Sequence, residues 1–175
     1  MRRFISIPLS AMLLVALAAP AAAAGPSGRG GQHVPVGSYD FTITSDIGCA
    51  GFDVLVEDLS GKILEIYLGF DGRGNERGKT MYHVVTRYTR VGTDTSFVRA
   101  FHSIGHYSLG PDESLAVTSI GDTLLWGPEP AAFGLSDGIW LIEGGKLHLA
   151  YDPAGGIGRA RLDRGSSFDV CAALG

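Results

Sequence analysis

The sequence has little amide and little charge. It contains one Asn, one Gln and three Lys among 175 residues, and charged residues make up 18% of the chain, against roughly 25% in average soluble domains. Hydrophobic residues make up 45%, which excludes an intrinsically disordered chain, because disorder requires low hydrophobicity and high net charge. The heptads that build a long coiled coil are missing. Glycine is abundant but follows no three-residue period, which excludes collagen.

Residues 1–24 have the features of a secretory signal peptide. Arg2 and Arg3 precede an apolar run over residues 5–19, and Pro20 is followed by four alanines, the small residues that a signal peptidase accepts. The apolar run is shorter than the ~20 residues of a membrane-spanning helix, and no cysteine follows it directly to carry a lipid. We therefore expect cleavage near Ala24 and a secreted chain with no stable membrane insertion.

Basic residues are too few for a nucleic-acid-binding surface. Without residues 1–24 the chain keeps 12 basic and 18 acidic residues, a net charge of −6, whereas such a surface would be basic. No nucleic-acid partner is expected.

The two cysteines are Cys49 and Cys171, which lie 122 positions apart. Two cysteines in an exported chain predict one disulfide, and two buried free thiols are the alternative. A disulfide over this span would connect the first part of the domain to its last.

Residues 25–37 are rich in glycine and proline and predict a flexible leader. The domain is expected over residues 38–175, where apolar residues alternate with polar ones as in strands. Tight turns are expected at residues 60–61, 121–122 and 144–145, and a loop is expected at 127–137. The expected strands cover residues 38–44, 52–58, 62–70, 80–91, 96–106, 114–120, 123–126, 138–143, 146–151, 159–162 and 167–172.

This pattern predicts an all-β fold. Outside residues 1–24 no segment has a sustained helical periodicity. A strand of twelve residues at 80–91 would span roughly 40 Å, which favours a tilted barrel strand. We expect a single antiparallel β-barrel of about 8–10 strands in meander order, with a β-sandwich as the alternative.

Several short features resemble a loose group of uncharacterised, actinobacterial-type secreted proteins. They are the early Cys49, the Asp152-Pro153 turn, the Gly158-Arg159 strand and the ending Asp169-Val170-Cys171-Ala172-Ala173-Leu174. The resemblance implies an all-β fold and export, and it brings no catalytic residues.

Histidines are the candidate site residues. If the turn at residues 92–95 sets the register, His83 lies opposite Ile104 and diagonal to His102, with both rings on one face. The functional interpretation places His83 and His102, together with Arg87, inside the barrel lumen against a small ligand. The alternative is structural or exposed histidines. No third ligand at a suitable spacing accompanies them, so no metal and no cofactor are expected.

Three functions remain open from the sequence. The first is binding of a small, largely apolar molecule in the barrel. The second is a cofactor-free cyclase or isomerase with His83 or His102 as general base. The third is an interaction protein of the envelope or matrix with a filled barrel. A lumen above roughly 300 Å³ would favour binding or catalysis. A lumen filled by side chains would favour the interaction protein. The sequence leaves catalytic residues and oligomeric state open.

Overall fold

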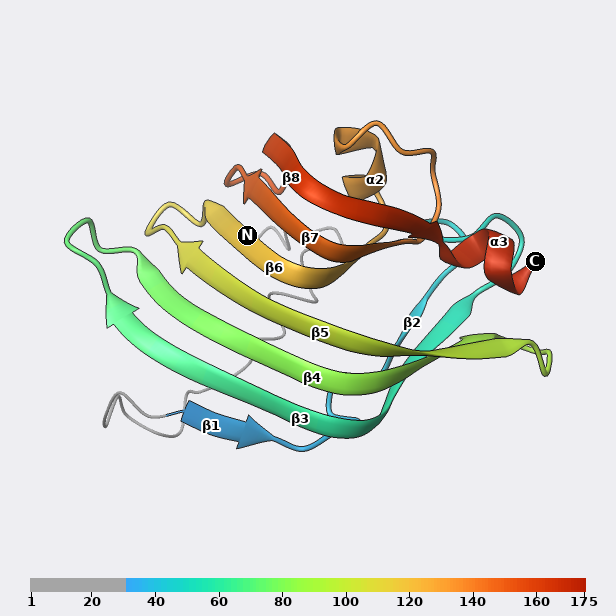
Figure 1. Ribbon diagram of the computed structural model, residues 1–175. Helices are drawn as coiled ribbons and strands as arrows, with labels where there is room; N and C mark the ends of the chain where they lie inside the picture. The colour runs from blue at the N-terminus through green and yellow to red at the C-terminus, as the bar shows by residue number, and fades with distance from the viewer. Residues whose placement is uncertain (1–30) are drawn as a thin grey trace, which may run out of the picture.

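The computed structural model describes residues 31–175, which form one antiparallel meander (Figure 1). The sheet has the order β1-β3-β4-β5-β6-β7-β8, and β2 pairs with the first residues of β3. The strands are β1 (Gly31–Val34), β2 (Phe41–Ile43), β3 (Val54–Phe70), β4 (Glu76–Arg90), β5 (Ser96–Leu109), β6 (Leu115–Leu125), β7 (Trp140–Tyr151) and β8 (Ile157–Asp169). Two short helices, α2 (Glu129–Ala132) and α3 (Val170–Leu174), complete the fold.

The start of the chain is described only in part. The expected signal peptide and residues 25–30 of the expected leader lie outside the described residues. Residues 31–34 of that leader form the short strand β1, which pairs with Ile63–Ile66 of β3. No helix within residues 31–175 is long and apolar enough to cross a membrane.

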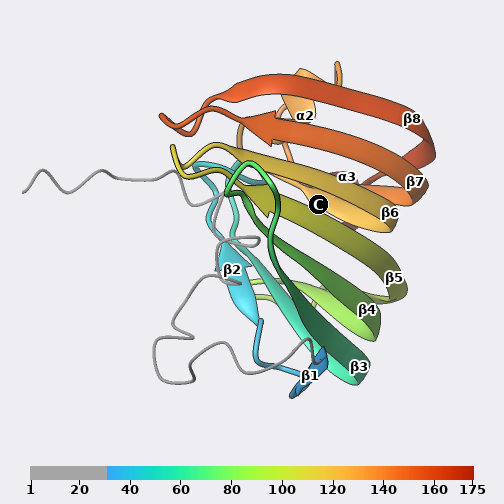
Figure 2. The same cartoon turned by 90° about the vertical axis from the view of Figure 1, so that its left-hand side faces the viewer.

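The sheet is strongly curved and open. Figure 2 shows the strands curling into a trough, with β2 on its concave side. Within residues 31–175 neither β1 nor β2 pairs with β8, so the two edges of the sheet stay apart. The prediction of an all-β antiparallel meander is confirmed, while the expected closure into a barrel is absent from this structure. We call the concave side of the sheet the inner face and the convex side the outer face.

Bulges that contain or adjoin glycines bend the long strands. Register shifts occur between Asp58 and Ser60, between Gly121 and Thr123, and between Glu143 and Lys146. Gly121 has a φ of +104°, and a Cβ there would lie 2.1 Å from the carbonyl oxygen of His102. Only glycine fits such a close approach of two strands, and the bend that it permits contributes to the curvature of the sheet.

The same bulges correct the strand prediction. Residues 60–61, 121–122 and 144–145 were expected to be hairpin turns, but the chain continues through them in β3, β6 and β7. Residues 159–162 and 167–172 likewise belong mostly to the single strand β8. The reason is that a glycine with positive φ serves a hairpin turn and a bulge equally well. The sheet therefore has eight strands.

Asp122 connects three strands where a ladder ends. The pairing of β5 with β6 runs only from Ser103–Gly121 to Leu109–Leu115, so the first half of β5 has no partner on that side. One carboxylate oxygen of Asp122 accepts the N–H of His102 at 2.8 Å, and the other accepts the N–H of Gly144 at 3.0 Å. These two bonds satisfy backbone donors that the interrupted ladder leaves without partners.

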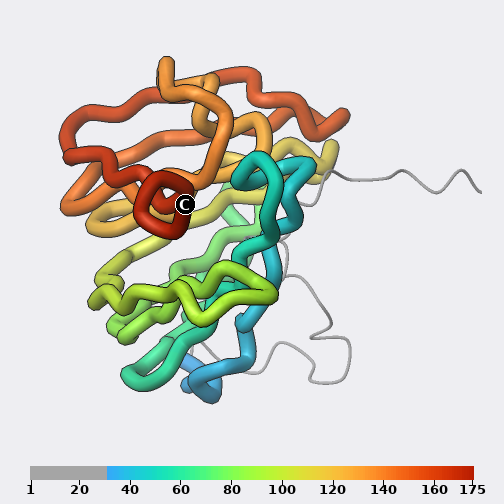
Figure 3. Tube along the Cα trace, turned by 90° about the vertical axis from the view of Figure 1, so that its right-hand side faces the viewer, coloured from blue at the N-terminus to red at the C-terminus, as the bar shows by residue number. Residues whose placement is uncertain are grey.

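Two hydrophobic clusters pack on the inner face. The first includes Ile43, Val54, Tyr88, Leu141 and Val170. Figure 3 shows the fold from the side on which the C-terminal α3 lies in front. The second lies over β6 and β7 and includes Val117, Leu147, Leu149 and Tyr151, with Phe133 and Leu135 of the chain after α2 packed against it. The core is thus divided into two parts along the trough.

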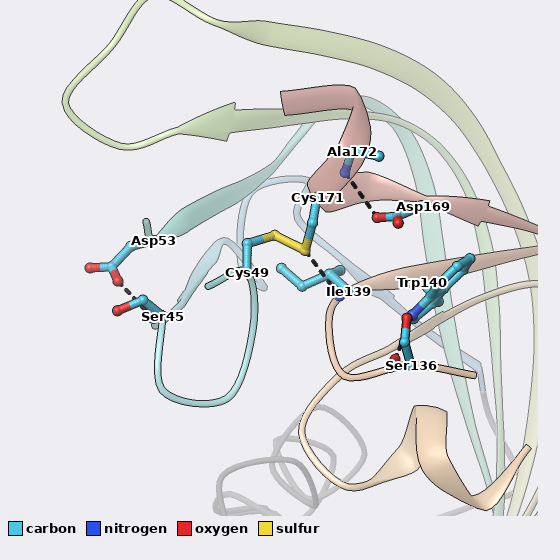
Figure 4. Close-up of a disulfide and its surroundings, with 9 residues drawn as sticks. All are labelled: Ser45, Cys49, Asp53, Ser136, Ile139, Trp140, Asp169, Cys171 and Ala172. Atoms are coloured by element: carbon cyan, nitrogen blue, oxygen red, sulfur yellow. Dashed lines mark hydrogen bonds between the residues drawn. A yellow bond between two sulfur atoms is a disulfide. The ribbon is translucent and has the colours of Figure 1, made fainter. Parts of the chain in front are cut away.

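The predicted disulfide between Cys49 and Cys171 is present (Figure 4). It joins the loop between β2 and β3 to α3, with 5.3 Å between the two Cα atoms. Cys171 was expected in the last strand, but it lies in α3, whose N-terminus is capped by the Asp169 carboxylate accepting the N–H of Ala172 at 2.9 Å. Because the sheet is open, this bond ties the β2–β3 side of the trough to the β8 side.

Candidate functional site

A cavity of about 120 Å³ lies on the inner face and borders both hydrophobic clusters. It is partly open to solvent. Its volume is below the roughly 300 Å³ of most ligand sites and close to the ~150 Å³ of an engineered apolar cavity that binds benzene. Aromatic and aliphatic side chains form most of its wall, among them Tyr82, Tyr88, Phe101, Tyr107, Leu124 and Trp126.

The absence of a side chain at Gly105 leaves part of this space open. The cross-strand register places Gly105 of β5 between Thr80 of β4 and Ser119 of β6, and all three line the cavity. A Cβ built on Gly105 would have no heavy atom closer than the carbonyl oxygen of Thr80, at 4.0 Å. A larger residue at this position would therefore occupy the cavity without striking the backbone.

One hydroxyl group in the cavity wall has no hydrogen-bond partner within residues 31–175. Ser103 and Ser119 share a hydrogen bond of 3.0 Å, and the hydroxyl of Thr123 donates to Ser119 at 2.7 Å. The side-chain oxygen of Thr80 is buried and has no hydrogen-bond partner among the described residues. A buried hydroxyl without a partner costs free energy, so Thr80 would gain from a polar atom on a bound molecule.

Glu129 of α2 is a buried carboxyl group in the same wall. It is 3% exposed and lines the cavity. The hydroxyl of Tyr151 donates to its Oε1, and the N–H of Trp126 donates to its Oε2 over a long 3.4 Å. Oε2 is therefore weakly satisfied, and it is the oxygen with capacity for a further hydrogen bond.

Burial changes the protonation of Glu129. Desolvation raises its pKa to about 7, and the hydrogen bonds from Tyr151 and Trp126 oppose the rise. A carboxyl group that titrates near neutral pH can exist as an acid or as a base under ordinary conditions. The same burial, together with the negative charge of Glu129, raises the pKa of Tyr151, so the phenol remains the donor in this pair.

A second carboxyl group lines the cavity from β3. Asp58 accepts the hydroxyl of Thr86 at 2.7 Å. Burial raises the pKa of Asp58, the bond from Thr86 opposes this, and the nearby charge of Asp40 adds to the rise. The cavity thus combines an apolar wall with carboxyl groups that are partly or fully removed from water.

The predicted site residues lie on the other side of the sheet. His83, His102 and Arg87 are on the outer face, because the neighbouring Tyr82, Val84 and Phe101 line the inner cavity and side chains alternate along a strand. Both histidines are exposed. Their predicted position inside a lumen is therefore wrong.

Arg87 is engaged in an ion pair on that outer face. Its guanidinium lies 3.0 Å from the Glu57 carboxylate, which is its cross-strand neighbour on β3. Arg87 pairs across β5 with Val98 rather than with a histidine, so it stands apart from His83 and His102.

The structure brings His83 and His102 closer than expected. The predicted register paired His83 with Ile104, whereas β4 and β5 pair His83 directly with His102. Thr89 and Ser96 form the last pair before the turn. The connection therefore starts before residue 92, where the turn was predicted to start, and this shifts the register between the two strands. The prediction that the two rings share a face is correct.

The cavity residues Thr80, Gly105 and Glu129 were not among the predicted candidates. Glu129 lies in the segment 127–137, which was expected to be a loop. Its Glu-Pro sequence after Gly127-Pro128 carries no signal for burial. The concentration of aromatic residues at Tyr82, Tyr88 and Phe101 was the available signal for the inner face.

Comparison with known proteins identified no similar protein. No family model, no curated protein and no solved structure matches the chain.

Proposed function

We propose that this protein binds a small, largely apolar molecule in the inner-face cavity. The observation that carries the proposal is the cavity itself, with its apolar wall, its volume of about 120 Å³ and the open space over Gly105. The cavity is somewhat smaller than the ~150 Å³ that admits benzene, and it is partly open to solvent, so it suits a molecule with one enclosed ring whose remainder extends toward the opening. Burial of such a molecule would be driven by the removal of apolar surface from water.

The polar groups of the wall indicate what else the ligand carries. The hydroxyl of Thr80 has no partner among the described residues, and Oε2 of Glu129 accepts only one long hydrogen bond. A ligand with one hydrogen-bonding group on an apolar body would satisfy one of them. Few well-placed polar groups in an apolar pocket are typical of small-molecule sites.

We also propose that the protein acts outside the cytoplasm. The signal-peptide pattern of residues 1–24 and the disulfide between Cys49 and Cys171 support this proposal, because disulfides persist in oxidising compartments. The resemblance to secreted proteins of actinobacterial type agrees with it. The cavity volume of about 120 Å³ is below the roughly 300 Å³ that would favour binding or catalysis, so it is the apolar wall and the buried carboxyl group, rather than the volume, that favour binding over an interaction protein with a filled interior.

A second candidate function is proton transfer on the bound molecule, as in a cofactor-free isomerase or cyclase. The buried Glu129, with a pKa of about 7, favours it, and this carboxyl group replaces His83 and His102 as the candidate general base because those histidines lie on the outer face. Deuterium exchange at the α-carbon of a bound ketone such as 1-indanone separates the two functions. If the protein only binds the ketone, the wild type will not catalyse this exchange. If Glu129 is a general base, the wild type will catalyse it and the Glu129→Gln protein will not.

Titration with 1-indanone, an apolar bicycle with one carbonyl group, tests the binding proposal. We expect saturable binding by isothermal titration calorimetry to the mature protein. Gly105→Val should weaken it by about tenfold or more, equal to ~1.4 kcal/mol, because the added side chain occupies the cavity. The fold should persist, since valine suits a strand better than glycine does.

Gly158→Val is the matched control. Gly158 is an exposed strand residue outside the cavity, and a Cβ there would lie 3.8 Å from the carbonyl oxygen of Ala150. Its affinity for 1-indanone should equal that of the wild type. Equal affinity in the Gly105→Val protein, or no saturable binding to the wild type, would contradict the proposal.

A further inference from the structure

The outer face carries a pair of histidines at close range. His83 of β4 and His102 of β5 are direct cross-strand partners, and their Nδ1 atoms share a hydrogen bond of 2.9 Å, in which one ring donates and the other accepts. The ring centroids are separated by 4.2 Å. Both side chains are exposed to solvent and both strands lie in the middle of the sheet, so the backbone holds the pair in place while the rings remain accessible.

The spacing of the two nitrogens matches two adjacent positions around a metal ion. Imidazole nitrogens bind first-row metals at about 2.0–2.1 Å. Two such ligands at a right angle are about 2.9 Å apart, whereas a tetrahedral angle would separate them by about 3.4 Å. The hydrogen bond holds the two nitrogens at 2.9 Å, so a metal ion that replaces the shared proton, with a small rotation of the rings, would find them near the tetragonal spacing that Cu(II) and Ni(II) prefer.

A thioether on the same face favours copper. Met81 precedes His83 by two residues in β4 and is paired with Ile104, next to the His83–His102 pair. Residues two apart in a strand share a face and lie roughly 6.6 Å apart, and the unbranched methionine side chain can span this gap. Soft thioether sulfur binds Cu(I) and is a poor ligand for Ni(II).

Charged side chains near the His83–His102 pair also affect whether it can bind a cation. Lys62 of β3 is the cross-strand partner of His83, and its positive charge opposes a cation, although its long side chain can turn into solvent. The Asp122 carboxylate accepts the backbone N–H of His102 at 2.8 Å, but it also lines the inner-face cavity, so it is not a ligand beside the two rings. Within residues 31–175 no three His, Cys, Asp or Glu side chains are grouped to hold a metal, so the site would rest on two histidines, the thioether and solvent.

We propose that His83, His102 and Met81 form a copper-binding site on the outer face. The two imidazole Nδ1 atoms bind Cu(II) in adjacent positions, with water completing the coordination, and the Met81 sulfur joins them when the ion is Cu(I). The site lies on the opposite side of the sheet from the apolar cavity, so it does not depend on the proposed binding function.

The test is titration of the metal-free, disulfide-intact mature protein with Cu(II) in the presence of glycine as competitor. We expect one equivalent to bind, with an electron paramagnetic resonance spectrum of tetragonal Cu(II) that shows two nitrogen ligands. His83→Ala and His102→Ala should each weaken binding by about 100-fold or more, because loss of a ligand should cost at least as much as the 10–100-fold expected for loss of a partner that only supports a ligand.

His106→Ala is the matched control, because His106 is an exposed histidine of β5 that pairs with Lys79 instead of a histidine. Its affinity should be unchanged. Met81→Leu should leave Cu(II) binding intact and weaken Cu(I) binding, measured by competition with bicinchoninate. Tight Cu(II) binding retained in the His83→Ala/His102→Ala double variant would contradict the histidine site. A Cu(I) affinity of the Met81→Leu protein equal to that of the wild type would contradict the role of the thioether.

Discussion

Replacement of Cys49 and Cys171 together by alanine is expected to lower the free energy of unfolding by about 3–5 kcal/mol. Closure of a loop of more than 100 residues is worth about 5 kcal/mol in the chain-entropy model, and measured effects are often smaller. The disulfide spans 122 residues and joins two sides of an open sheet whose edge strands do not pair. Chemical denaturation of the variant and the wild type measures the difference.

The wild type unfolded under reducing conditions is the control, and it should show the same loss of stability as the variant. A difference below 1 kcal/mol between oxidised wild type and variant would show that packing alone holds the two sides together. In that case the cluster around Ile43, Tyr88 and Val170, rather than the covalent bond, would be the main connection.

Stability is expected to fall as the pH rises from about 4.5 to about 7. In the folded protein Glu129 keeps its proton up to a pKa of about 7, against an ordinary value of 4.5. Between these values the folded state binds more protons than the unfolded state, so the free energy of unfolding decreases with increasing pH and levels off above about 7. The loss is at most about 3 kcal/mol, since each pKa unit equals 1.36 kcal/mol.

Glu129→Gln should remove this contribution, because glutamine carries no charge over the whole range and its amide oxygen can still accept the Tyr151 hydroxyl. Denaturation midpoints at pH 5 and pH 8 measure the effect, and Glu113→Gln, a change at an exposed carboxylate, should behave as the wild type does. The same pH dependence in the Glu129→Gln protein would show that the burial of this carboxyl group is not what sets it.

Much of the fold could be predicted from local patterns. The alternation of apolar and polar residues identified most strand positions, and the cysteine count in an exported chain identified the disulfide. The bulges at Gly61 and Gly121 were mistaken for turns, because a glycine with positive φ is compatible with both. Whether a strand turns back or continues depends on its partner strand, which lies far away in the sequence.

The prediction of which face of β4 and β5 points inward was wrong for a related reason. The prediction that His83 and His102 share one face was correct, and the alternation of side chains places Tyr82, Tyr88 and Phe101 on the other face. Curvature decides which set faces inward, and the curvature depends on bulges in β3, β6 and β7. The aromatic set occupies the inner face because its large apolar area gains most from burial.

The cavity depends on contacts that no local pattern carries. Glu129 meets Tyr151 because the chain after β6 folds back over the inner face, and these residues are 22 positions apart. The open space over Gly105 arises from its register between Thr80 and Ser119. Both features follow from the arrangement of strands in space.

Intermolecular nuclear Overhauser effects between 1-indanone and the protein test most directly which face of the sheet receives the ligand. We predict contacts from the indanone protons to the rings of Tyr82 and Phe101, and none to the imidazole protons of His83 and His102. Contacts to the two imidazole rings without contacts to the aromatic rings of the cavity would contradict the assignment of the binding site to the concave side of the sheet.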